Sequence, residues 1–165
     1  MEQRPLLKIQ PKPTDKALEI VAFAALVALW LFVCYLYTKM PQTVPTHFNG
    51  AGKADGFGDK ESTFIAPAIV TVLFIGLTFL QRKPHWYNYL SEITSENAEK
   101  QYTIGVKMLR VLKLALVIVF GLIEFSSYKV ATGDAEALGK WLLPMVFGLV
   151  FIPIFYFLIQ FSKNQ

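Results

Sequence analysis

Long apolar runs alternate with polar connections along this chain. Four of the runs reach or approach the length of a membrane-spanning helix, and we place the spans at about 17–37, 63–81, 111–128 and 141–161. A helix needs about 20 mostly apolar residues to cross a bilayer, and the runs lack the strict alternation of membrane β-strands. Because backbone polar groups in lipid must be hydrogen-bonded within the segment, the pattern predicts an all-α, polytopic integral membrane protein.

Composition agrees with this class. Of the 165 residues, 54% are hydrophobic and only 17% are charged, which is unusual for a soluble domain. We interpret the formal net charge of +4 as a signal of topology and of attraction to anionic lipid. The lipid bilayer is therefore an expected partner, and nucleic acid is not.

Basic residues indicate how the chain is oriented. Lys and Arg are concentrated in an N-terminal tail, 1–16, and in the segment 82–110, whereas basic and acidic residues balance in the connection 39–62. Short loops rich in Lys and Arg stay in the cytoplasm. We therefore predict a four-helix membrane domain, 17–162, in the bacterial cytoplasmic (inner) membrane, with both termini in the cytoplasm and 39–62 outside.

The outer connection 39–62 holds the most polar and glycine-rich stretch of the chain. Asn-Gly and Asp-Gly pairs tolerate positive φ, so we expect successive tight turns. Such turns can form a concavity for an anion, and Asn and Asp oxygens suit a hard cation. Either these side chains hold the loop together or they bind a ligand directly. The candidate binding residues are His47, Asn49, Gly52, Asp55, Gly56 and Lys60.

Glu124 lies near the outer end of the third predicted span. A carboxyl group there is costly unless it faces a polar partner, water or the head groups. In one interpretation it reaches the outer interface or the hydroxyl group of Ser126 or Ser127. In the other it contacts His47 or Lys60, which would couple the conformation of the loop to the packing of the helices.

The cytoplasmic segment is expected to begin a long helix. Thr94 or Ser95 can cap its start, and no Pro occurs from Ser95 to Tyr128, so one helix is predicted to continue into the third span. Glu19 is expected at the interface. Three basic residues spaced three apart are expected to snorkel to lipid head groups, namely Lys107, Arg110 and Lys113.

Two blocks of sequence resemble a known family. They are PTHFNGAGKADGFGDK at 45–60 and NYLSEITSENAEKQY at 88–102, the latter with Leu90 where the family usually has Pro. In these blocks the chain resembles the bacterial membrane family called domain of unknown function 1648, over roughly its first 110 residues. The same domain forms the N-terminal part of SdpI-type proteins. The resemblance marks a cytoplasmic block with Asn88, Tyr89, Glu96, Asn97, Gln101 and Tyr102.

The resemblance to SdpI-type proteins implies a function. It implies immunity to a secreted toxic peptide and sensing of that peptide, with capture of a transcriptional repressor at the inner leaflet. The first hypothesis is therefore an SdpI-like membrane sensor or immunity protein, whose outer loop binds a peptide or ion and alters the cytoplasmic segment. The alternative is a non-catalytic accessory or structural subunit of a larger bacterial membrane complex. A small transporter is a third hypothesis and would need an oligomer to enclose its pathway.

Enzymatic motifs are absent from the sequence. HExxH, GxSxG, P-loop, CxxC and GxGxxG arrangements do not occur. The two histidines, His47 and His85, are predicted on opposite sides of the membrane, so they cannot share an active site. We predict no enzyme, no catalytic residues, no cofactor and no metal site.

Overall fold

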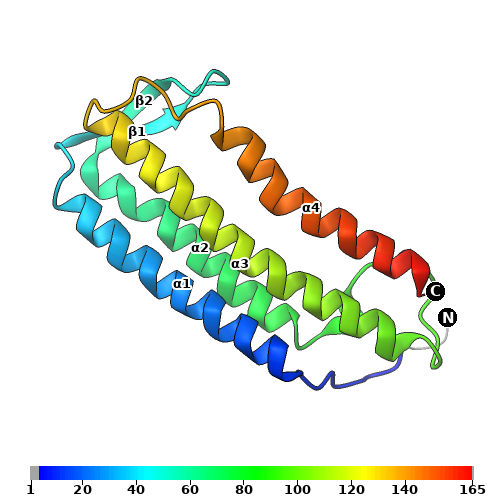
Figure 1. The fold of residues 1–165 in the computed structure, drawn as a ribbon. Coiled ribbons are helices and arrows are strands. Elements are labelled where there is room, and N and C mark those ends of the chain that lie inside the picture. The colour runs from blue at the N-terminus through cyan, green and yellow to red at the C-terminus, as the bar shows by residue number, and fades with distance from the viewer. Residues whose placement is uncertain (1–3, 165) are drawn as a thin grey trace.

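The computed structural model describes residues 4–164, in which four long helices form an antiparallel bundle (Figure 1). They are α1 (Pro13–Tyr37), α2 (Ile65–Leu80), α3 (Ala98–Ala131) and α4 (Leu142–Lys163). The connections α1–α2 and α3–α4 lie at one end of the bundle. The α2–α3 connection and both described ends of the chain lie at the other end. The structure thus places the N-terminal tail and the segment 82–110, both rich in Lys and Arg, at the same end of the bundle, as the charge pattern predicts.

Helix α3 is the centre of the bundle, since it packs against α1, α2 and α4. The main core lies where α1, α2 and α3 meet, and small or branched side chains let the helices approach closely. Its buried members are Ala22, Leu26, Leu29, Val33, Val70, Phe74 and Val117. The opposite faces of α1, α2 and α4 carry large exposed apolar side chains, as expected for helices that face lipid.

Three helical segments among residues 4–164 are long and apolar enough to cross a membrane by length and composition. They are Pro13–Tyr37, Lys60–Leu80 and Leu142–Lys163. The predicted third span, 111–128, lies within α3 and is not among them, so four transmembrane helices are not confirmed. Helix α3 differs physically from the other three helices, because it carries several buried charged side chains and is covered by its neighbours.

The α1–α2 connection contains a β-hairpin that an all-α prediction with successive turns missed. Strand β1 (Thr43–Phe48) pairs antiparallel with β2 (Ala54–Asp59), with irregularities on both sides of His47. The aromatic and β-branched residues of β1 favour a strand. Gly58 allows the strands to meet, because a Cβ there would lie 2.9 Å from Thr46 Cγ2. A short 3₁₀ helix, η1 (Lys60–Phe64), continues into α2.

Helix α3 is one unbroken helix of 34 residues, which confirms that a single helix continues from the α2–α3 connection into the third predicted span. Its N-cap is Asn97, beyond the two expected caps. The Thr94 N–H donates to Asn97 Oδ1 (3.0 Å), and the Asn97 N–H donates to Thr94 Oγ1 (3.3 Å). This reciprocal pair satisfies backbone groups before the first turn.

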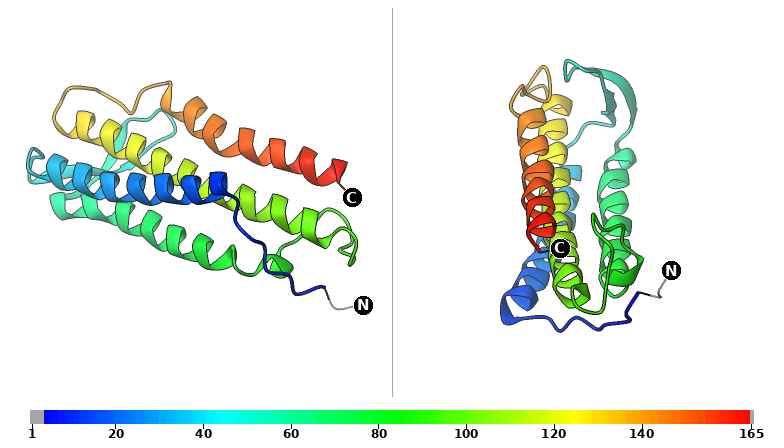
Figure 2. Two further views of the ribbon diagram at one scale, coloured as in Figure 1. Left: turned by 60° about the horizontal axis from the view of Figure 1, so that its bottom comes forward. Right: turned by 90° about the vertical axis from the view of Figure 1, so that its right-hand side faces the viewer.

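The N-terminal segment 4–12 has no regular secondary structure and passes under the ends of the helices (Figure 2). We call it the N-terminal strap. The Arg4 guanidinium donates to the carbonyl groups of His85 (3.0 Å) and Tyr87 (2.6 Å). The Tyr102 hydroxyl donates to the Pro5 carbonyl (3.1 Å). These contacts hold the strap against the α2–α3 connection, which includes the short 3₁₀ helix η2 (Pro84–Trp86).

Candidate functional site

The candidate residues of the predicted outer loop fall into separate groups in the structure. His47 Nδ1 lies 2.5 Å from Asp55 Oδ1, and both side chains are largely exposed. An exposed pair of this kind contributes little to folding. The Lys60 ammonium lies elsewhere, 4.4 Å from the centre of the Tyr37 ring. The structure therefore pairs His47 with Asp55 but does not bring Lys60 to them.

Asn49 and Gly52 form the turn of the hairpin. Asn49 Oδ1 accepts hydrogen bonds from the N–H groups of Ala51 (2.9 Å) and Lys53 (3.1 Å). Gly52 has a φ of +75°, a conformation that favours glycine. Its carbonyl accepts a hydrogen bond from the Leu138 N–H (2.9 Å). These contacts support the interpretation that Asn49 and Gly52 hold the loop together, and they tie the hairpin to the α3–α4 connection.

Gly56 has a packing role beside the exposed pair. It faces His47 across the hairpin, and a Cβ at Gly56 would lie 3.0 Å from His47 Cβ. The absence of a side chain at Gly56 therefore lets the two strands approach closely at His47.

A cavity of about 210 Å³ lies beneath the hairpin, between β1, the start of α2 and the C-terminal part of α3. Its polar lining groups include Glu124, Ser127, Thr46 and Ser62. Glu124 is 6% exposed. Within residues 4–164 its carboxylate has no ion pair, and none joins it to His47 or Lys60. A buried carboxylate thus faces a cavity without a cationic side chain beside it.

The opposite end of the bundle contains a cluster of tyrosines. Tyr89 lies at its centre, with ring-centre distances of 5.9 Å to Tyr87, 5.6 Å to Tyr102 and 5.6 Å to Phe161. Its hydroxyl donates to the Pro84 carbonyl (2.9 Å). Burial raises the pKa of Tyr87, Tyr89 and Tyr102 above the ordinary value. The phenols therefore stay protonated and act as hydrogen-bond donors.

The other residues of the predicted cytoplasmic block divide into buried and exposed groups. Gln101 is buried, and its Nε2 donates to the carbonyl groups of Phe161 (3.2 Å) and Asn164 (2.8 Å) at the end of α4. The Asn97 amide donates to the Glu92 carbonyl (3.0 Å). Two residues of the block are exposed at this end, namely Asn88 and Glu96.

A network of buried charges connects α1, α2 and α3 near this end. Arg110 Nη1 lies 3.3 Å from Asp15 Oδ1, and Arg110 Nε lies 3.3 Å from Glu19 Oε1. The Lys113 ammonium donates to the Glu19 carboxylate and to Thr78 Oγ1 (3.0 Å). Two acidic and two basic side chains thus compensate each other inside the bundle. We call these four charged residues the charge network.

The charge network corrects the expectation that Arg110 and Lys113 snorkel to head groups, and it gives Glu19 two basic partners. The side chains of Arg110 and Lys113 are buried, whereas Lys107 is exposed as expected. The residue spacing gave an indication of this network, since Asp15 and Glu19 are four residues apart and the two basic residues are three apart. Each pair therefore shares one helix face.

The described residues 4–164 contain no group of three or more His, Cys, Asp or Glu side chains that could hold a metal ion. The arrangement instead offers two separate polar centres. One is the cavity with Glu124 beneath the hairpin, and the other is the charge network with the tyrosine cluster at the opposite end.

These apolar helices, with polar centres at both ends, define the chain as a membrane protein. It belongs to the family described as "Domain of unknown function (DUF1648)", whose model matches residues 24–71. This match covers most of α1, the hairpin and the start of α2, and so includes the first resembling block, 45–60, but not the second, 88–102.

A similar protein occurs in an archaeon. A protein of Archaeoglobus fulgidus, described as uncharacterized, is 30% identical over 176 residues, which span 94% of this chain and 93% of that protein. The likeness therefore extends from the hairpin region through all four helices. No solved structure matches the chain.

Proposed function

We propose that this protein is a membrane sensor, in which a ligand bound beneath the hairpin alters the opposite end of the bundle. One observation carries the proposal: Glu124 faces a cavity at one end of α3, and residues at the other end of the same unbroken helix hold two other segments. Tyr102 donates to the strap, and Gln101 donates to the end of α4. A rigid element with distinct contacts at both ends can transmit a displacement between two sites.

In this proposal α3 is the fourth transmembrane helix, shielded from lipid by α1, α2 and α4. The hairpin faces outward, and the strap and the α2–α3 connection face the cytoplasm of a prokaryotic cell. The distribution of Lys and Arg supports this orientation. The α3–α4 connection is balanced too, with Lys129 and Lys140 against Asp134 and Glu136, and it lies at the same end of the bundle as 39–62, which supports the orientation as well.

The chemistry of the cavity favours a cationic ligand. A carboxylate in poorly polar surroundings gains most from a positive partner, because attraction between charges strengthens as the dielectric constant falls. The volume of about 210 Å³ suits an amino or guanidinium group better than a whole peptide. A secreted peptide, as the resemblance to SdpI-type proteins implies, would insert one basic side chain. Immunity to such a peptide is part of this proposal.

The coupling can be tested without knowing the ligand. Glu124→Gln removes the negative charge and so imitates the charge compensation that a bound cation would give. The measurement is hydrogen–deuterium exchange at the amides of 84–102 in purified, lipid-embedded protein. We expect the exchange protection of these amides to change. Phe125→Leu is the matched control, since this neighbouring side chain is partly exposed and does not line the cavity. Unchanged exchange in Glu124→Gln would contradict the proposed coupling.

The alternative is an accessory subunit of a larger complex, and a row of exposed aromatic side chains on α4 favours it. Phe147, Phe151 and Phe155 are four residues apart, are exposed, and lie 5.3 and 6.4 Å from one another by ring centres. This aromatic ridge could pack against a helix of another membrane protein. Purification from native membranes in mild detergent, followed by mass spectrometry, separates the two proposals. A stoichiometric partner lost in Phe151→Leu supports the subunit, and a lone chain supports the sensor.

A further inference from the structure

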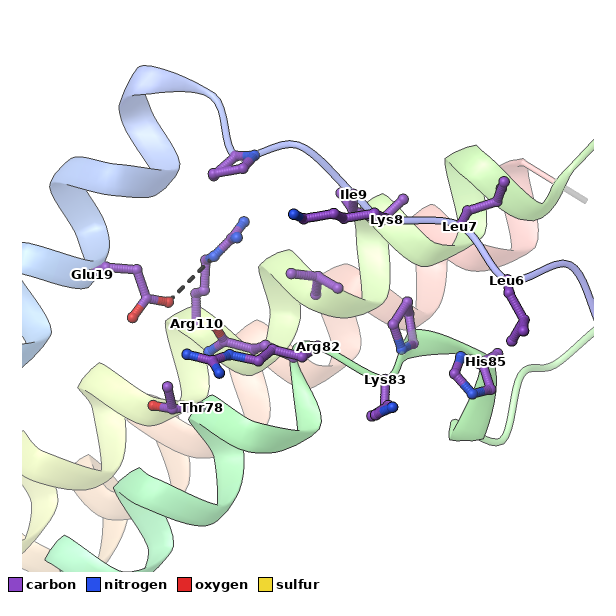
Figure 3. A pocket seen from close by; sticks show the side chains of 14 residues that line it. Leu6, Leu7, Lys8, Ile9, Glu19, Thr78, Arg82, Lys83, His85 and Arg110 are labelled. Carbon is purple, nitrogen blue, oxygen red and sulfur yellow. Dashed lines mark ion pairs between the residues drawn. The ribbon is translucent and has the colours of Figure 1, made fainter.

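A second and larger cavity lies at the end of the bundle opposite the hairpin, between the strap and the ends of α1, α2 and α3 (Figure 3). Its volume is about 740 Å³. We propose that it binds a phosphate-containing anion, either the head group of an anionic lipid or a free phosphate compound. This inference is independent of the proposed sensor function, because it uses neither the hairpin nor Glu124.

The charges around the cavity favour an anion. Four side chains with a permanent positive charge line it, Lys8, Arg82, Lys83 and Arg110, against one acidic side chain, Glu19. Arg110 belongs to the charge network, whose two acids and two bases balance. The other three cations have no ion pair within residues 4–164. An excess of positive charge therefore surrounds the space.

The orientation of the side chains distinguishes these cations. Figure 3 shows the side chains of Lys8, Arg82 and Arg110 extending into one space between the strap and the helices, whereas Lys83 is turned to another side. The Arg82 guanidinium comes from just after the end of α2, and the Arg110 guanidinium comes from within α3. Guanidinium groups match the geometry of phosphate oxygens through paired N–H donors. Lys8 of the strap would add a point charge above them.

An unsatisfied donor provides a second indication. The buried amide nitrogen of Gln81, Nε2, has no hydrogen-bond partner in the described part of the chain. Gln81 lines the cavity. Buried donors are nearly always hydrogen-bonded, so a donor without a partner beside a cavity indicates a missing acceptor. A phosphate group supplies several acceptor oxygens at once.

The surroundings favour a lipid as the source of the phosphate. Leu6 is 79% exposed and Trp86 is 57% exposed, and both lie in segments that border the cavity. Exposed apolar and aromatic side chains beside basic residues are typical of a segment at the bilayer interface. Basic pockets between helix ends at the cytoplasmic face bind anionic head groups. The strap would then lie over the head group and help to hold it.

Native mass spectrometry of the detergent-solubilised full chain tests this inference. The probes are dioleoylphosphatidylglycerol, dioleoylphosphatidylcholine and inorganic phosphate. We expect saturable binding of phosphatidylglycerol to the unmodified protein. In the double variant Lys8→Gln/Arg82→Gln the apparent Kd should be about tenfold or more higher, because each of the two substitutions removes a charge-assisted contact. The matched control is Lys16→Gln/Lys107→Gln, which removes the same charge from exposed positions at the same end.

The two sources of phosphate give different results. Competition by millimolar inorganic phosphate supports a free phosphate compound, and its failure to compete supports a lipid head group. Equal binding of the two lipids, or an unchanged Kd in the Lys8→Gln/Arg82→Gln variant, would overturn the inference. Gln81→Leu keeps the net charge and removes one buried donor. It should also weaken binding, which provides a second test if the double variant does not fold.

Discussion

Lys113 on α3 donates a hydrogen bond to the Glu19 carboxylate on α1 from a position that is only 1% exposed. The same ammonium group donates to Thr78 on α2 and lies 4.4 Å from the centre of the Phe74 ring. One lysine thus joins three helices. Because a buried charge without its partner is costly, the arrangement of these helices depends on both members of the pair.

Removing one member of this pair should destabilise the protein strongly. We expect Lys113→Met or Glu19→Gln to lower the free energy of unfolding by about 3 kcal/mol, since each leaves an uncompensated charge in the bundle. The double variant Lys113→Met/Glu19→Gln should lose less than the sum, because Arg110 keeps Asp15 as its partner. Titration with SDS in mixed micelles measures these free energies.

The control for this cycle is Lys107→Met, which removes the same charge from an exposed position on the same helix. It should change the free energy of unfolding by less than about 0.5 kcal/mol. Additive losses in the double variant would show that Lys113 and Glu19 do not compensate each other.

The hairpin should depend on glycine at position 58. In Gly58→Ala the new Cβ would lie 2.9 Å from Thr46 Cγ2 and 3.2 Å from Ser62 Oγ. We expect a loss of about 1–3 kcal/mol, typical of overpacking, and faster hydrogen exchange in 43–59. Adding Thr46→Ser removes the closest clashing atom and should restore part of the protection.

Gly50→Ala is the control for the hairpin, because nothing lies within 4 Å of a Cβ at that position and its φ is not positive. Its exchange rates in 43–59 should match those of the unmodified protein. Equal exchange in Gly58→Ala and Gly50→Ala would contradict the close packing between the strands.

The sequence predicted the helices well because apolar length is a local property. The runs beginning near residues 17, 63 and 141 correspond to α1, α2 and α4, and the unbroken α3 follows from the absence of Pro. The hairpin was missed because its glycines indicate turns equally well. They form a strand only through contacts across the hairpin, such as Gly58 with Thr46.

The candidate sites were predictable only in part. Glu124 was recognised because a carboxyl group in an apolar run is costly by itself. The charge network was missed because its members are about 95 residues apart, and only the packing of α1 on α3 brings them together. The larger cavity, which basic side chains line, depends on the path of the strap. The contacts of Arg4 and Pro5 determine that path. Composition alone does not encode that path.

The end of α4 should depend on Gln101. Gln101→Ala removes two hydrogen bonds to carbonyl groups of 161 and 164, which lie in or just after the last turn of α4. The Phe161 carbonyl keeps its bond from the Asn164 N–H (3.3 Å). We expect a loss of about 1–3 kcal/mol in the free energy of unfolding and faster exchange or proteolysis in 158–164.

Thr103→Ala is the matched control, since the Thr103 hydroxyl donates only to the Glu99 carbonyl within α3. It should leave the end of α4 protected. If Gln101→Ala behaves like this control, the buried amide does not hold α4 in place.

The orientation of the bundle can be tested with single cysteines. Cys34, the one cysteine of the chain, is replaced by Ser, and three exposed residues are changed in turn, Lys53→Cys, Lys100→Cys and Asp134→Cys. With an impermeant maleimide on intact cells, we expect positions 53 and 134 to react and position 100 to react only after permeabilisation. Labelling at 53 but not at 134 would show that α3 does not cross the membrane. The reverse pattern at 53 and 100 would invert the proposed topology, because the segments rich in Lys and Arg would then lie outside.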